Sequence, residues 1–283
     1  MHARPYKQVD VFTAQPYLGN PLAVVLDGAD LSDARMQSFA RWTNLSETSF
    51  VLPPTDAKAD YRVRIFTPGG EMPFAGHPTL GSCHAWLEAG GKARTQGFVA
   101  QQCGVGLVKI RREQDRLAFR APAMKRSAPS ATSLARVARA MGLKADQIVA
   151  AQLLDNGTAW LGLLLHDPST VLQLTPNFSE LKELGQKVGV VALKTTPVAI
   201  GGAGAEVRGF APHMGINEDP VTGSLNASLA QWLIDDGHAP ERYVATQGAC
   251  LDRAGYVYIE RDAQGQVWVG GQSVTCIDGQ VTV

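Results

Sequence analysis

The sequence predicts an α+β fold that is organised as two similar halves. Short runs of β-branched or alternating apolar residues dominate the 283-residue chain, and segments with helical periodicity are few and separated. One motif occurs in each half, with a strand expected before each copy and a helix after it. The two copies lie about half the chain length apart, which is typical of the duplication of a whole domain rather than of a short solenoid unit.

The first half is expected to end near residue 120, and its sequence predicts mainly strands. Short apolar runs bounded by turn residues predict strands at 9–12, 22–26, 49–52, 61–66, 106–110 and 117–120. Apolar residues at helical spacing predict helices at 31–42 and 78–89.

A linker is expected between the halves, because the segment APAMKRSAPSATS at 121–133 is rich in Pro, Ser and Ala and lacks apolar periodicity. The predicted domains are therefore 1–120 and 121–283, and the last strand, at about 274–283, could pack back on the first half. Beyond the linker the sequence predicts strands at 148–153, 159–165, 190–194, 198–200, 207–210, 256–260 and 267–269, and helices at 134–141, 178–188 and 220–235.

The charge balance of the chain excludes several kinds of partner. Lys plus Arg total 26 and Asp plus Glu total 26, so the net charge is zero. A neutral chain has no long-range field that attracts nucleic acid or an anionic membrane. No apolar run has the length of a signal peptide or approaches the roughly 20 residues of a membrane span. We therefore expect a cytoplasmic protein with neither nucleic acid nor membrane as a partner.

No residue pattern indicates a metal or an organic cofactor. The four cysteines form no C-x-x-C pair, and most histidines are scattered along the chain. The glycine-rich run at 201–204 does not complete G-x-G-x-x-G, and the chain has no Walker sequence. We expect no metal site, no cofactor, and cysteines that serve as small apolar residues.

The repeated motif reads FAGHPTLGS at 74–82 and EDPVTGS at 218–224. Aligned on their prolines, the two copies share a preceding polar residue and a following Gly-Ser pair. Proline suits the first position of a helix, which would place His77 and Asp219 at two helix N-caps. Helix starts bind anions through their backbone N–H groups, and two matching copies favour a shared carboxylate or enolate site over two ordinary caps. Apolar residues at i, i+4, i+7 and i+8 predict a buried face on the second helix: Leu225, Leu229, Trp232 and Leu233.

Four segments resemble the motifs of the PhzF-like family of phenazine biosynthesis, in that family's order. They are GNPLAVV at 19–25, NLSETSF at 44–50 and the two copies of the repeated motif. The wider fold group of the family includes diaminopimelate epimerase and proline racemase. The resemblance implies two similar halves, each a curved, mostly antiparallel sheet wrapped round a central helix, with the active site in the cleft between them. It also implies a homodimer.

The resemblance further implies a cofactor-independent isomerase or epimerase that moves a proton on a small carboxylate-bearing substrate. Isomerisation of a dihydro-hydroxyanthranilate, the reaction after which the family is named, is one of several activities open to the chain. Matched residue by residue, Glu47 falls on the family's acid/base glutamate, and three residues fall on groups that assist it: His77, Asp219 and Ser224. Six further residues resemble positions that contact the substrate in the family: Asn20, Ser46, Gly76, Asn156, Gly157 and Gly223.

One departure from the epimerase branch bears on mechanism. Those enzymes use two cysteines, one near each helix start, whereas neither copy of the repeated motif here contains cysteine. Cys83 follows the first copy and falls inside the expected helix. A mechanism with two thiols is therefore not expected for this chain.

Plainer interpretations of the same residues stay open at this point. The run Asn44 to Glu47 has the N-x-x-E spacing of a helix capping box, in which Glu47 would only cap a helix. His77 could likewise only cap its helix. A non-catalytic protein that binds small acids would need the helix starts but no acid/base group, so the presence of Glu47 beside the other three candidates favours an enzyme.

Overall fold

The computed structural model describes residues 2–194 and 204–283, which form two compact units. Unit 1 combines the chain up to Arg120 with Gly270–Val283, and unit 2 is Ala121–Val269. The strand expected at 198–200 lies outside the described residues, as does the glycine-rich run at 201–204 apart from Gly204. No helix within the described ranges is long and apolar enough to cross a membrane.

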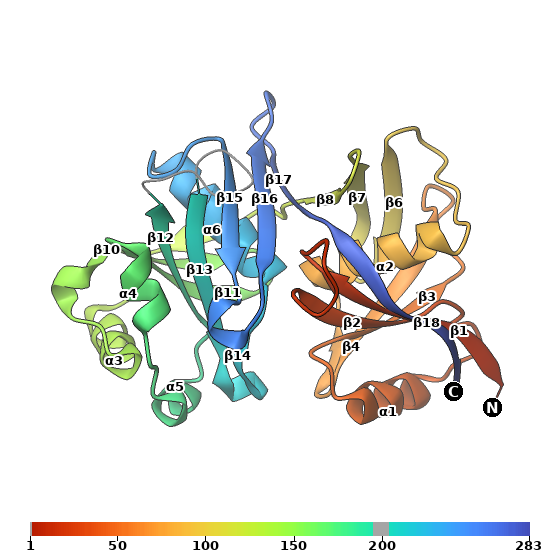
Figure 1. Ribbon diagram of the computed structural model, residues 1–283, viewed down its shortest axis with the longest axis horizontal. Helices are drawn as coiled ribbons and strands as arrows, with labels where there is room; N and C mark the ends of the chain where they lie inside the picture. Colours follow the sequence, from red (N-terminus) through yellow and green to blue (C-terminus); the bar gives the residue numbers. More distant parts are fainter. Residues whose placement is uncertain (1, 195–203) are drawn as a thin grey trace. The chain divides into compact units, whose positions relative to one another are not determined.

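Unit 1 is a mostly antiparallel sheet with two helices (Figure 1). Its elements are β1 (Ala3–Val11), β2 (Asn20–Val25), α1 (Asp33–Thr43), β3 (Thr48–Leu52), β4 (Tyr61–Thr67), β5 (Gly70–Met72), α2 (Gly76–Glu88), β6 (Phe98–Cys103), β7 (Gly106–Arg112), β8 (Leu117–Arg120) and β18 (Ser273–Thr282). The strands pair in the order β18, β1, β2, β3, β4, β6, β7, β8, and β5 forms a hairpin with the end of β4.

Unit 2 is built in the same way and, in its described residues, carries three α-helices besides the central one. Its elements are β9 (Lys125–Ser127), α3 (Ala131–Met141), β10 (Ile148–Asp155), β11 (Ala159–Leu165), α4 (Pro168–Gln173), α5 (Phe178–Leu184), β12 (Val188–Lys194), β13 (Gly204–Ala211), β14 (Ile216–Asp219), α6 (Gly223–Asp235), β15 (Arg242–Gln247), β16 (Gly255–Arg261) and β17 (Val267–Gly271), whose last residues belong to unit 1. The strands pair in the order β9, β10, β11, β12, β13, β15, β16, with β14 on β13.

The succession of strand pairings is the same in the two units. In each series the third and fifth pairings are parallel and the others are antiparallel, so β2–β3 and β4–β6 correspond to β11–β12 and β13–β15. The hairpin strand β5 corresponds to β14, and the helix that follows it, α2 or α6, has 13 residues in both units. The predicted α+β class with two similar halves is therefore confirmed.

The two helices also fix the register of the repeat, and the register that aligns the prolines is wrong. Equal helix bounds match Gly76 with Gly223, so His77 corresponds to Ser224 rather than to Asp219. Pro78 lies inside the first turn of α2, whereas Pro220 precedes α6. Both positions tolerate a residue that lacks an N–H, so a proline does not by itself locate the helix start.

The central helices are buried because small or apolar residues face the sheet. On α2, a Cβ atom at Gly81 would lie 2.6 Å from Cδ2 of Leu22 and 2.9 Å from Cγ2 of Val11, so only glycine permits this close approach. The apolar face predicted for α6 is confirmed, since each of its four residues is at most 1% exposed: Leu225, Leu229, Trp232 and Leu233.

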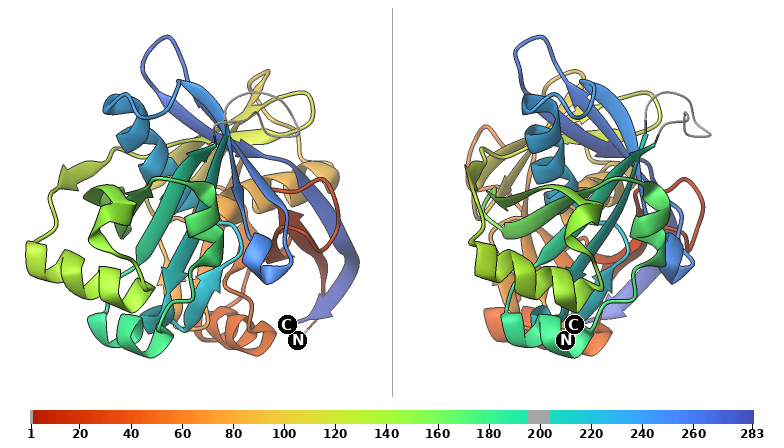
Figure 2. Two further views of the ribbon diagram at one scale, coloured as in Figure 1. Left: turned by 60° about the vertical axis from the view of Figure 1, so that its left-hand side comes forward. Right: turned by 90° about the vertical axis from the view of Figure 1, so that its left-hand side faces the viewer.

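A second hydrophobic cluster in unit 2 lies between the sheet and the helices α3, α4 and α5. It includes Val137, Val171 and Leu181 from these helices and Phe210 from β13. Figure 2 shows α3 (yellow-green) and α5 (green), which are in contact, on this face of the sheet. The six-residue α4 escaped the sequence analysis, and α5 is shorter than expected because Gly185 ends it in the left-handed region.

The remaining differences from the expected elements concern short or polar strands. The segment expected to be a linker contains β9, which pairs with β10. Strands β5 and β14 have only 3 and 4 residues. Strands β6 (FVAQQC) and β15 (RYVATQ) contain buried glutamines that interrupt the apolar pattern. Periodicity alone therefore could not identify them.

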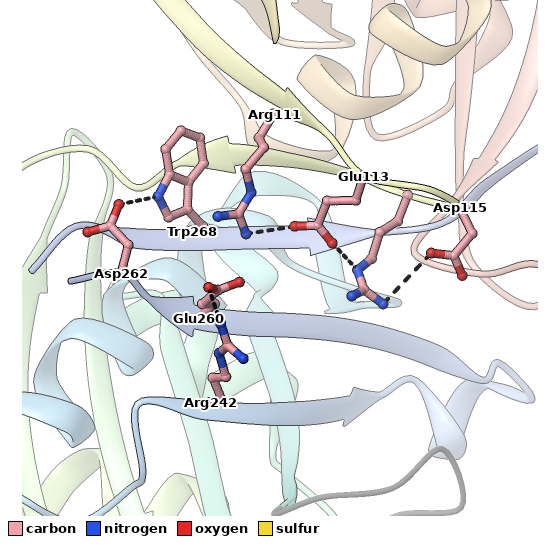
Figure 3. A network of polar contacts seen from close by, with 8 residues as sticks. Arg111, Glu113, Asp115, Arg242, Glu260, Asp262 and Trp268 are labelled. Carbon is pink, nitrogen blue, oxygen red and sulfur yellow. Dashed lines mark hydrogen bonds and ion pairs between the residues drawn. The ribbon is translucent and has the colours of Figure 1, made fainter. Parts of the chain in front are cut away.

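Polar contacts close a surface hairpin in each unit (Figure 3). In unit 2, the carboxylate of Asp262 accepts a hydrogen bond from Nε1 of Trp268 at 2.8 Å. It also accepts the backbone N–H of Gln266 at 2.9 Å. In unit 1, Glu113 binds Arg111 at 2.6 Å and also binds Arg116. The side chains of these ion pairs are 21–30% exposed, and ion pairs near the surface contribute about 0–1 kcal/mol each, so they shape the hairpin more than they stabilise the fold.

Candidate active site

Glu47 lies in the turn between α1 and β3, with its carboxylate close to His77. The distance from Oε2 of Glu47 to Nε2 of His77 is 3.4 Å. The side chains are 14% and 4% exposed, so both are largely shielded from water. Unit 1 therefore brings together the two residues that the family resemblance marked as the acid/base group and one of its assistants.

The capping-box interpretation of Glu47 is wrong, because Asn44 ends a helix instead of beginning one. Asn44 is the C-cap of α1, in the left-handed region at φ 54°, and its backbone N–H donates to the carbonyl of Ala40. Asparagine adopts this conformation more readily than most residues. The chain reverses direction there and places Glu47 directly before β3.

The two helix starts lie at different residues from those expected. Helix α2 begins after the N-cap Ala75, so His77 is inside the first turn, and α6 begins after the N-cap Thr222. Asp219 is the last residue of β14. Neither N-cap side chain caps its helix, and the first turns begin at the buried glycines Gly76 and Gly223.

Asn20 begins β2, and Ser46 lies just before β3, the strand that pairs in parallel with β2. Asn20 is the first residue of β2 and is 1% exposed, while Ser46 is half-buried and precedes Glu47. The turn before Asn20 is held by Asp10, whose Oδ2 accepts the backbone N–H of Gly19 at 3.0 Å. A Cβ atom at Gly19 would lie 2.3 Å from the carbonyl oxygen of Val11, so this turn requires glycine.

In unit 2, Ser224 and Asn156 are in direct contact. Asn156 Nδ2 donates to the backbone carbonyl of Ser224 at 3.0 Å. Ser224 Oγ accepts a hydrogen bond from Nε1 of Trp160 at 3.2 Å, a partner that the sequence analysis missed. Gly157 lies next to Asn156 in the turn between β10 and β11, with φ at 97°. The β10–β11 hairpin therefore positions the first turn of α6.

Asp219 contacts a second residue that the sequence analysis missed, Thr222. The hydroxyl of Thr222 lies 2.6 Å from Oδ2 of Asp219. Thr222 in turn contacts the buried Gln247 of β15. Thr222 could have been noticed because it belongs to the repeated motif, but no local pattern singles out Gln247.

The structure offers no reactive thiol at either helix start. Cys83 lies in the middle of α2 and is fully buried. Burial raises the pKa of this thiol to about 12, so it is protonated at neutral pH. Within the described residues, no group of three or more His, Cys, Asp and Glu side chains could hold a metal ion.

We predict that activity is independent of thiols. Replacing all four cysteines with Ala or Ser should leave turnover within roughly tenfold of wild type, with any loss caused by packing defects. A thiol reagent at neutral pH should label the exposed Cys250 and spare Cys83 until the protein unfolds. Loss of all activity in a folded Cys83→Ser variant would contradict this prediction.

Comparisons with known proteins bear on the family of the chain. The model of the family PhzC-PhzF, phenazine biosynthesis-like protein, matches residues 9–279. The chain is 36% identical over 99% of both chains to antisense-enhancing sequence 1 of Schizosaccharomyces pombe. It is 31% identical to trans-2,3-dihydro-3-hydroxyanthranilate isomerase of Pseudomonas aeruginosa, over 97% of this chain and 98% of that one. An uncharacterized isomerase, YddE of Salmonella typhimurium, is 31% identical over 94% of both chains.

Solved structures show the same fold. A PhzF-family protein of Bacillus anthracis superposes with a TM-score of 0.84 over 100% of both chains at 24% identity. A PhzF-family protein of Enterococcus faecalis gives 0.80 over 100% of both chains at 27% identity. A probable proline racemase of Agrobacterium radiobacter gives 0.65 at 13% identity, covering 99% of this chain and 93% of that one. The chain belongs to the phenazine biosynthesis-like protein family, PhzC-PhzF, and is an enzyme of the isomerase class.

Proposed function

We propose that this isomerase moves a proton on a small carboxylate-bearing substrate, without a cofactor, and that Glu47 is the acid/base group. The observation that carries the proposal is the contact between Glu47 and His77 at the start of α2. A glutamate can take a proton from a carbon atom beside a carboxylate and return it to another position. His77 orients the substrate or relays the proton in this scheme.

The helix starts would stabilise the charge that develops on the substrate. When a proton leaves the carbon, negative charge moves onto the carboxylate oxygens as an enolate forms, and backbone N–H groups at a helix start bind such oxygens. Ser224 Oγ accepts a hydrogen bond from the indole N–H of Trp160, which can only donate. The hydroxyl hydrogen of Ser224 can therefore point elsewhere and donate to the substrate. Asp219 acts on the same substrate in this proposal.

The experiment that tests the function is solvent deuterium exchange. The protein is incubated in D2O with trans-2,3-dihydro-3-hydroxyanthranilate, the substrate in the name of a relative, and with a panel of amino and hydroxy acids. Mass spectrometry and NMR then report deuterium at a C–H position. Enzyme-dependent exchange into at least one acid is expected, whereas exchange into none of them by folded protein would refute the proposal.

We predict that Gly223→Val weakens the binding of a carboxylate ligand. Gly223 has helical backbone geometry, so valine fits the backbone, but its side chain would block approach to the first turn of α6. The dissociation constant of anthranilate, measured by calorimetry, should rise at least tenfold, and this loss of binding free energy should exceed the loss in the free energy of unfolding. Ala131→Val at the exposed start of α3 is the matched control. Unchanged affinity in folded Gly223→Val would contradict the role of this helix start.

The family resemblance also leads us to propose that the protein works as a homodimer. The chain has a mass of 30.2 kDa. Size-exclusion chromatography with light scattering should therefore give a mass of about twice that of one chain. A mass equal to one chain at micromolar concentration would exclude a stable dimer.

A further inference from the structure

A buried cluster of amide and hydroxyl groups lies beside Asp219 in unit 2. Its centre is Gln247 of β15, which is 1% exposed. Gln247 Oε1 accepts the backbone N–H of Thr222 at 3.1 Å and Nδ2 of Asn226 at 2.9 Å. Gln247 Nε2 donates to the backbone carbonyl of Asp219 at 3.0 Å and to Oγ1 of Thr222 at 3.0 Å. All hydrogen-bonding atoms of this amide are in use, which fixes its position.

The direction of every hydrogen bond in this cluster follows from the chemistry of the groups. The backbone N–H of Thr222 can only donate and the carbonyl of Asp219 can only accept, so they fix which end of the Gln247 amide is oxygen. The NH2 group of Gln247 must then donate to Thr222 Oγ1. The single hydrogen of Thr222 is left to donate to Oδ2 of Asp219, at 2.6 Å. Oδ2 of Asp219 is therefore the acceptor of this hydrogen bond.

The hydrogen bond from the Thr222 hydroxyl to Asp219 is unusual for a threonine at a helix N-cap. Thr222 is the N-cap of α6, where a threonine hydroxyl ordinarily accepts a hydrogen bond from the helix. Here its side chain makes no capping hydrogen bond. The hydroxyl donates to Asp219 instead, and Gln247 binds the N–H of Thr222. A device that only stabilised the helix start would not turn the N-cap hydroxyl toward the carboxylate.

Unit 1 places a buried glutamine on the corresponding strand. Gln101 of β6 is 0% exposed, accepts the hydroxyl hydrogen of Tyr61 at 2.7 Å, and donates to Thr79 Oγ1 in the first turn of α2 at 3.1 Å. Both glutamines lie where their strand pairs in parallel with the strand that precedes the hairpin, β4 or β13. In the register set by the two helices, Thr79 corresponds to Asn226, which also contacts Gln247, so each unit places a buried glutamine against the first turn of its central helix.

We propose that Gln247 and Thr222 are positioning residues that orient the carboxylate of Asp219 and keep Oδ2 as an acceptor. The importance of this orientation for turnover rests on the proposed function. The orientation itself is a property of the folded protein and can be observed without substrate. The hydrogen-bond chain runs from the Gln247 amide through the Thr222 hydroxyl to the Asp219 carboxylate.

The test compares variants that differ in one hydroxyl group. Thr222→Val keeps the shape of the side chain and removes the hydroxyl, whereas Thr222→Ser keeps the hydroxyl and removes a methyl group. For deuterium exchange into trans-2,3-dihydro-3-hydroxyanthranilate, Thr222→Val should lower kcat by about 10- to 100-fold with KM within threefold. Thr222→Ser should restore kcat to within threefold of wild type. A purely packing role predicts the opposite order of the two variants.

Thr246→Val is the matched control. Thr246 Oγ1 also donates to a buried carboxylate at 2.6 Å, but that carboxylate belongs to Glu206, which is outside the candidate site. Thr246→Val should leave kcat within twofold. An equal loss of kcat in Thr246→Val and Thr222→Val would show that removing any buried hydroxyl from this sheet lowers kcat to the same extent. That result would overturn the proposal.

Crystal structures of the variants give a readout that does not depend on activity. In Thr222→Val, the Asp219 side chain should occupy a different or a divided set of rotamers, while Thr222→Ser should keep the wild-type rotamer. Gln247→Glu is a second variant, because a carboxylate cannot donate to Thr222 and should draw its hydrogen away from Asp219. An unchanged Asp219 in both Thr222→Val and Gln247→Glu would overturn the proposal. Absence of exchange by wild-type protein would instead count against the proposed function.

Discussion

Glu47→Gln should lower the rate of deuterium exchange by about 100-fold or more, which corresponds to roughly 2.7 kcal/mol of transition-state stabilisation. Glutamine has nearly the same shape and can still form a hydrogen bond with His77, but it cannot accept a proton from carbon. The loss should therefore fall on kcat, and the dissociation constant of anthranilate should stay within about threefold of wild type.

The control for this prediction is a glutamate whose charge lies at the surface. Glu180 of α5 pairs with the exposed Arg139, and such pairs contribute little to stability. Glu180→Gln should leave exchange within about twofold. Exchange at the wild-type rate in folded Glu47→Gln would show that another residue is the base, and the proposed mechanism would then have to be rebuilt around that residue.

The fold class could be predicted from the sequence because it depends on local patterns. Strands such as β8 and β11 are short apolar runs bounded by turn residues, and they appear where expected. Four apolar residues at helical spacing likewise predict the buried face of α6. Strands β6 and β15 were not predictable in this way. Their buried glutamines are polar, and hydrogen bonds with distant segments of the chain offset the cost of burying them.

The candidate site shows the same division between local and distant causes. Glu47 and His77 each belong to a short motif that can be recognised in the sequence alone. The structure brings Oε2 of Glu47 to 3.4 Å from Nε2 of His77. The register of the repeat could not be read from the prolines, because a proline is tolerated at several positions around a helix start. Gln247 is 25 residues from Thr222, so its role depends on the pairing of β15 with β13.

A buried ion pair holds the end of β14, directly before Asp219. Arg208 of β13 forms a two-pronged contact with Glu218, at 2.9 Å through Nε and 2.8 Å through Nη2. Both side chains are 5% exposed. Arg208 Nη1 also donates to the carbonyls of Val171 and Leu174 at 3.1 and 2.8 Å. Burial alone would lower the pKa of Arg208, but the hydrogen bonds and charge of Glu218 outweigh it and raise that pKa.

Arg208→Met should therefore destabilise the protein by about 3–5 kcal/mol, because it leaves Glu218 as a buried charge without its cation and removes the donors of two carbonyl groups. Urea unfolding followed by circular dichroism measures this change in the free energy of unfolding. The double variant Arg208→Met/Glu218→Leu removes both charges and should regain most of the loss. Arg242→Met, which breaks the exposed pair with Glu260 seen in Figure 3, should cost less than about 1 kcal/mol. If Arg208→Met costs no more than Arg242→Met, the buried pair does not anchor β14, and the position of Asp219 must depend on Gln247 and Thr222 instead.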